Sequence, residues 1–109
     1  MSVHTSQVTV STSQTLLVPS TQRRLSYVVS VPSTSSTIYI TNNSGTTSGT
    51  GTPIVANGTF RMNWFDDGTQ NTNRPLKALT ASGTSDVRVI ETLADTPEDY
   101  IRITRGIRA

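Results

Sequence analysis

Hydrophobic and polar residues alternate in short runs along most of the chain, which is the pattern of half-buried β-strands. The clearest run, over residues 25–31, puts four apolar side chains on one face and ends at Pro32. Proline cannot donate a hydrogen bond to a sheet, so it closes a strand. The whole pattern predicts eight short strands, at Gln7–Val10, Thr15–Val18, Leu25–Val31, Thr37–Thr41, Thr59–Trp64, Leu76–Thr80, Ser85–Glu91 and Tyr100–Thr104.

The alternation also predicts which side chains form the core. Phe60, Met62 and Trp64 fall on one side of their run, and Val87 and Val89 fall on one side of theirs. Because one face of each strand must be buried, we expect these five side chains to meet inside the protein.

Many short strands without a long helix are typical of an all-β protein. The sequence predicts an antiparallel β-sandwich or small barrel of the jelly-roll type. One helical turn is expected at Asp95–Asp99, where Asp or Thr can cap the helix and Pro is tolerated in its first turn. The predicted organisation is an N-terminal arm or edge strand over residues 1–14, a sandwich over residues 15–104 and a basic tail over residues 105–109.

The segment from Tyr39 to Arg61 contains no charged residue between its ends and no His or Cys. It lies between two predicted strands, and Asn42, Asn43 and Gly45 favour a tight turn. After a short apolar anchor over residues 53–55, Asn-Gly at positions 57 and 58 is typical of a hairpin turn. We therefore expect a surface loop within one sheet, because connections run over the surface.

Composition limits the size of the core. Only 33% of the 109 residues are hydrophobic and 15% are charged, while the chain contains 14 Ser and 20 Thr. Low charge argues against disorder, and abundant Thr suits pleated sheets, so the chain is expected to fold around a thin core. A thin core favours support from a partner or from further copies of the chain.

Charge and cysteine usage exclude several classes of function. A net charge of +2 does not support nucleic-acid binding by a broad basic patch. Without cysteine there is no disulfide framework and no thiolate chemistry. The N-terminal sequence lacks the regions of a secretory signal, and no apolar run reaches the ~18 residues of a membrane span. The expectation is a soluble protein without membrane contact that does not export itself.

Catalytic and metal-binding chemistry has few candidates. His4 is the single histidine and lies in the predicted arm, a poor position for a general base, so no catalytic residue, cofactor or metal is assigned. Asp66-Asp67-Gly68 with Gln70, Asn71 and Asn73 is rich in the oxygen ligands of calcium, but it lacks the EF-hand spacing. A strand-ending turn is the preferred interpretation.

Charged residues supply the candidate partner-binding positions. Asp86 and Arg88 share the face of their strand opposite Val87 and Val89, where they can meet charges of a neighbour. At the C-terminus Arg102, Arg105 and Arg108 recur at intervals of three and can reach acidic groups, although a solubilising tail is the simpler interpretation.

Four aromatic residues, Tyr27, Tyr39, Trp64 and Phe65, offer a carbohydrate-stacking platform as an alternative to core packing. Tyr27 and Trp64 lie in apolar alternation, which favours packing for these two.

The order of segments from Thr37 to Glu91 resembles short β-rich virion proteins of tailed bacteriophages. The resemblance rests on Thr-Ile-Tyr-Ile-Thr-Asn at 37–42, Gly-Thr-Pro-Ile-Val at 51–55 and above all Ala-Ser-Gly-Thr-x-Asp-Val-Arg-Val-x-Glu at 81–91, where x is any residue. Some of those proteins act as cement or decoration proteins on capsids. Residues 1–36 and 93–109 lie outside the resemblance, and it transfers no catalytic residue.

The resemblance implies a structural protein of the capsid surface that is assembled in the host cytoplasm. It would stabilise the head by bridging subunits of the major capsid protein, and a homotrimer is expected because local threefold positions are favoured docking points. The alternative is a tail- or fibre-associated adhesion module whose loops at 42–52 and 66–73 bind a host surface glycan.

Overall fold

The computed structural model describes residues 2–33, 35–41 and 51–106. Within these residues, eight strands and three helices follow one another. The strands are β1 (Ser2–Val10), β2 (Thr15–Val18), β3 (Arg24–Ser30), β4 (Ile38–Thr41), β5 (Thr52–Ile54), β6 (Thr59–Asn63), β7 (Leu76–Thr80) and β8 (Ser85–Leu93). The helices are α1 (Trp64–Asp67), α2 (Thr69–Asn73) and α3 (Pro97–Gly106).

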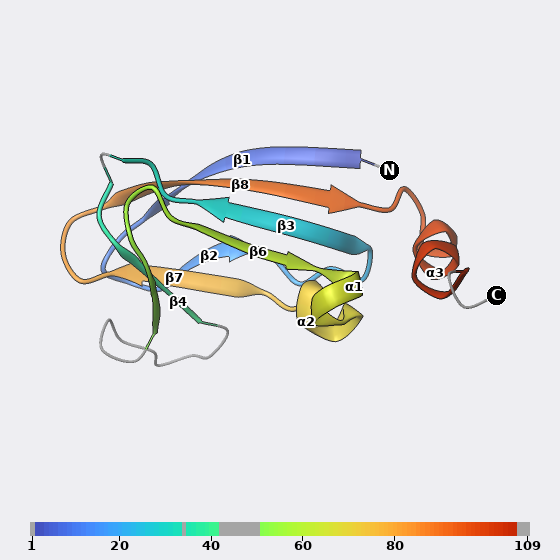
Figure 1. Cartoon of the computed structure of the whole chain (residues 1–109). Coiled ribbons are helices and arrows are strands. Elements are labelled where there is room, and N and C mark those ends of the chain that lie inside the picture. The colour runs from blue at the N-terminus through green and yellow to red at the C-terminus, as the bar shows by residue number, and fades with distance from the viewer. Residues whose placement is uncertain (1, 34, 42–50, 107–109) are drawn as a thin grey trace.

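The strands form two antiparallel four-stranded sheets that face each other (Figure 1). One sheet has the strand order β1-β8-β3-β6 and the other β2-β7-β4-β5. Successive strands alternate between the sheets from β1 to β4. In the second half of the chain, β5 and β6 add an edge strand to each sheet, and β7 and β8 insert between β2 and β4 and between β1 and β3. This is the double Greek-key arrangement of a jelly roll. The predicted all-β sandwich is confirmed.

The core lies between the two sheets and follows the predicted alternation closely. All four apolar side chains of the run at 25–31 are buried, as are Ile38 and Ile40. Val87 and Val89 are almost completely buried, and Phe60 and Met62 pack against the core from its margin. The buried core residues are Val10, Leu17, Val18, Tyr27, Val29, Val31, Ile38, Ile40, Ile54, Leu76, Ala78, Val87 and Val89.

Trp64 departs from the prediction. It opens helix α1 instead of ending β6, and it is half-buried outside the core cluster. The strand ends at Asn63 because the Asn63 Oδ1 atom accepts a hydrogen bond from the Asp66 backbone N–H at 2.8 Å, which caps the helix. A local capping bond therefore outweighs the continuation of the alternating pattern.

The predicted strand at Tyr100–Thr104 is wrong, because these residues belong to helix α3. Thr96 Oγ1 accepts a hydrogen bond from the Asp99 backbone N–H at 3.1 Å, and Pro97 stands in the first turn, so the predicted helical turn starts a helix of 10 residues. The described residues still contain eight strands, because the segment expected only as an apolar anchor forms strand β5. In the described part of the chain no helix has the length and apolar character required to cross a membrane.

The predicted turn at Asn57-Gly58 is confirmed, but it closes no hairpin, because it joins β5 and β6, which belong to different sheets. Asn57 has a positive φ of 66°, and the Gly58 backbone N–H donates to the Val55 carbonyl at 2.8 Å. A Cβ atom at position 58 would lie 2.8 Å from that carbonyl oxygen, so glycine is required by close approach. The expectation of a loop within one sheet is wrong, because the two strands that flank the segment, β4 and β6, belong to different sheets. Residues 42–50 of this segment lie outside the described residues.

Candidate interaction surface

The outer face of the sheet β1-β8-β3-β6 carries the predicted positions Asp86 and Arg88. The register between strands arranges this face in rows that cross the sheet. The rows are Gln7, Arg88, Ser30 and Thr59; then Thr5, Ile90, Val28 and Arg61; then Val3, Thr92, Ser26 and Asn63. We call these residues, together with Thr9 and Asp86, the outer face of the first sheet.

This face has an apolar centre and a polar surround. Ile90 and Val28 are neighbours in the middle row, and Ile90 is 45% exposed. Hydroxyl and amide side chains fill most of the other positions, with Arg88 and Arg61 on either side of the apolar pair. Protein interfaces commonly combine an apolar centre, a polar rim and arginine, so the arrangement suits contact with another protein.

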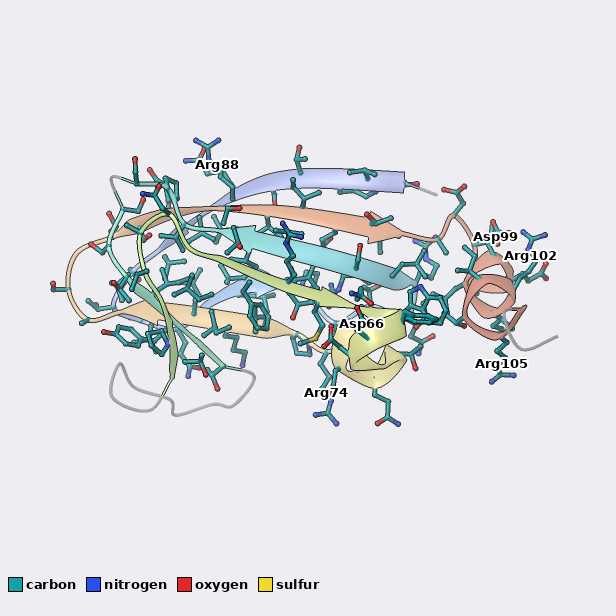
Figure 2. The ribbon with its side chains drawn as sticks, in the orientation of Figure 1. Asp66, Arg74, Arg88, Asp99, Arg102 and Arg105 are labelled. Atoms are coloured by element: carbon teal, nitrogen blue, oxygen red, sulfur yellow. The ribbon has the colours of Figure 1, made fainter. Side chains whose placement is uncertain are left out.

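A shallow depression of about 400 Å³ lies where β1 and β8 meet. Asp86, next to it along β8, accepts a hydrogen bond from Thr9 Oγ1 at 3.1 Å. The Arg88 side chain points away from the sandwich (Figure 2). The lining residues of the depression are Thr5, Ser6, Gln7, Arg88, Val89 and Ile90.

The structure does not bring the predicted arginines together. Arg102 and Arg105 belong to α3, which lies beyond the ends of the strands, and Figure 2 shows them at one end of the molecule, well away from Arg88. Arg102 is already paired with Asp99, one turn earlier in the helix. Arg108 lies outside the described residues. The four predicted partner-binding residues that the structure describes are thus divided between a sheet face and helix α3.

Arg24 is a buried arginine that the alternation of the sequence does not indicate. Its side chain is fully buried, and all its nitrogens have partners. Nη1 lies 3.1 Å from a carboxylate oxygen of Glu91 on β8, and the guanidinium stands over the ring of Tyr27 at 5.1 Å. The remaining bonds, at 2.7–2.8 Å, go to the carbonyl groups of Pro19, Thr72 and Arg74. Arg24 therefore ties two connecting segments to β8.

A bulge explains why alternation did not reveal Arg24. The register between β3 and β8 shifts between Arg24 and Ser26, so that Arg24 and Leu25 are both buried although they are adjacent. Burial lowers the pKa of Arg24, and Glu91 opposes that shift. Burial raises the pKa of Tyr27, and the positive charge of Arg24 opposes it. Because each side-chain nitrogen of Arg24 has a hydrogen-bond partner, we assign this arginine a structural role in the sandwich.

The acidic turn is a capping arrangement. Both of its carboxylates accept hydrogen bonds from Asn63, which donates from its backbone N–H to Asp67 Oδ2 at 2.9 Å and from its side chain to Asp66 Oδ2 at 3.0 Å. The segment expected as a strand-ending turn thus follows the end of β6, but it is folded into the short helices α1 and α2.

The four aromatic residues do not form one platform. Tyr27 is buried in the core, whereas Tyr39 belongs to the other sheet. Trp64 and Phe65 contact each other edge to face, with ring centroids 5.4 Å apart, and Phe65 is 67% exposed.

His4 lies exposed on β1, directly opposite Glu91 on β8. Within residues 2–33, 35–41 and 51–106, no group of three or more His, Cys, Asp or Glu side chains is placed to hold a metal ion.

Together these features define an eight-stranded jelly-roll sandwich with an exposed, mixed apolar and polar sheet face. Comparison of the chain with protein-family models, with curated proteins and with solved structures found no match.

Proposed function

We propose that the chain is a structural virion protein of a tailed bacteriophage, which docks on the major capsid protein as a cement or decoration protein. The observation that carries the proposal is the outer face of the first sheet, where Ile90 and Val28 form an apolar centre between two arginines. A protein that bridges neighbours requires such a face on a rigid support, and a sandwich of two hydrogen-bonded sheets provides it.

Two further features support the same proposal. Jelly rolls form many viral capsid domains, an argument by analogy of fold. In addition, Asp86 and Arg88 belong to the motif at 81–91 that carries the resemblance to phage virion proteins, and Ile90 lies within the same segment. The resemblance and the candidate surface therefore coincide on β8.

Binding to capsids tests the proposal. Purified protein is mixed with capsids of the matching phage that lack it, and the bound fraction is measured by sedimentation. We expect saturable binding and an increased resistance of the capsids to heat. Ile90→Ser should weaken binding about tenfold, because a substitution at the apolar centre of an interface costs more than one at its rim.

Leu16→Ser is the matched control. Leu16 is 48% exposed, similar to Ile90, but belongs to the outer face of the other sheet. Absence of binding to the capsids would contradict the proposed function, and equal losses for the two variants would contradict the assignment of the face.

A glycan-binding adhesion module remains the second candidate, favoured by one observation. Phe65 is exposed and supported edge-on by Trp64, as an aromatic side chain that stacks on a sugar would be. A glycan array, probed with and without calcium, separates the candidates: a cement protein should bind no sugar, whereas Phe65-dependent binding would favour adhesion.

A further inference from the structure

The four edge strands of the sandwich differ in how they are protected against pairing with another strand. Natural edge strands are kept unpaired by short length, proline, bulges or charged side chains. β5 has three residues and contains Pro53. β2 has four residues, its register with β7 shifts after Leu16, and Pro19 follows it directly in the sequence. β6 has five residues with Arg61 at its centre.

β1 has none of these protections. It has nine residues in unbroken register with β8, and it contains no proline and no Lys, Arg, Asp or Glu. In an antiparallel pair, alternate residues direct their N–H and C=O groups toward the partner and the others away from it. Every second residue of β1 therefore presents its backbone polar groups at the free side of the sheet.

The first half of β1 is also exposed on both faces. Val3, Thr5 and Gln7 are exposed on the outer face, and His4 and Ser6 are exposed on the inner one. Only Val8 and Val10, near the end of the strand, pack on the core. Figure 1 shows β1 along the upper margin of the sandwich, with no other labelled element beyond it. A polar strand in this position gains little from the core of its own sandwich.

We infer that the free edge of β1 pairs antiparallel with β1 of a second copy of this chain, so that the two first sheets join into one eight-stranded sheet. The second copy is favoured because a twofold axis makes each hydrogen bond reciprocal, and such an interface needs no separately matched partner. The strand has no Lys, Arg, Asp or Glu that would repel its own copy, and Thr opposite Thr or Ser is a favourable cross-strand pair.

The charge of one position tests this pairing. Purified wild-type protein should have the mass of a dimer by light scattering at micromolar concentration. Thr5→Lys and Thr5→Glu should each weaken association at least tenfold, because like charges meet across the axis. An equimolar mixture of the two variants should recover the dimer. Thr59→Lys, on the opposite edge of the same sheet, is the matched control and should remain dimeric.

Cross-linking provides a second test that does not depend on charge. The chain has no cysteine, so a single introduced cysteine can form a disulfide only between copies. Among Thr5→Cys, Ser6→Cys and Gln7→Cys, at least one should give a cross-linked dimer on mild oxidation, and Thr59→Cys should not. Circular dichroism of each variant should match the wild type, because these side chains are exposed.

The result that would overturn the inference is a monomeric wild type, a mass of three copies, or association that Thr5→Lys leaves unchanged. Equal cross-linking at position 59 and at the three positions of β1 would also overturn it. A twofold pair differs from the homotrimer predicted from the sequence, and the mass distinguishes them. These measurements use the isolated chain, so their outcome is separate from that of capsid binding.

Discussion

Strands β1 and β8 are each nine residues long and pair along their whole length, but they differ in what holds them. β8 lies between β1 and β3, and its inward side chains Ser85, Val87 and Val89 are almost completely buried. β1 has one neighbour, and its first half is exposed on both faces. Equal length and full pairing thus do not imply equal stability: β8 is fixed by the core, whereas β1 is held mainly by hydrogen bonds to β8.

The largest effect is expected where β8 meets Arg24. Arg24→Met should lower the free energy of unfolding by about 3–5 kcal/mol, because Glu91 and three carbonyl groups lose a buried partner. His4→Ala, on the β1 residue opposite Glu91, should change it by less than about 0.5 kcal/mol. Urea denaturation measures both, and equal losses would show that the Arg24 network is not a principal support of β8.

A smaller contrast is expected for one substitution made on each strand. Val89→Ala should cost roughly 2–3 kcal/mol, since it removes two buried methyl groups and leaves a cavity. Val3 is 65% exposed, so Val3→Ala should cost about 0.5 kcal/mol or less. Thermal unfolding followed by circular dichroism compares the pair. A similar loss at both positions would mean that β1 is supported by more than its backbone.

Hydrogen exchange should resolve the contrast along each strand. Amides of Val87 and Val89 should exchange only on global unfolding, whereas those in the first half of β1 should exchange roughly tenfold faster or more, through local opening. If β1 pairs with a second copy, dilution into the monomer range should accelerate exchange in β1 and leave β8 unchanged. Uniform exchange across both strands at every concentration would contradict this expectation.

The smallest effect concerns pH. Because burial raises the pKa of Tyr27 above its ordinary value near 10, the folded protein retains the phenol proton that the unfolded chain has already released. Stability is therefore unaffected well below pH 10 and decreases as the pH rises through and above it. Tyr27→Phe should flatten this decrease, measured by denaturation at pH 9–11. Tyr39→Phe is the control: it leaves Tyr27 in place, so the stability of this variant should still decrease at high pH.

Most of the fold could be predicted because strand alternation is a local signal. The runs at 15–18 and 76–80 have the predicted bounds, and the run at 25–31 has the predicted inner face. The pattern failed where hydrogen bonds to single side chains decide the structure. The hydrogen bond to Thr96 starts a helix in residues whose alternation predicts a strand. The hydrogen bond to Asn63 caps helix α1, so that β6 ends before Trp64.

The sequence by itself determined the class of the fold, the two faces of each core strand and the turn at Asn57-Gly58, since these depend on neighbours within a few residues. Only the tertiary structure decided the strand order, the burial of Arg24 and which strands stand at the edges. These features join residues that lie far apart in the chain, and such contacts leave no local pattern. The exposed edge of β1 and the face around Ile90, where we place the contacts with other proteins, belong to this second group.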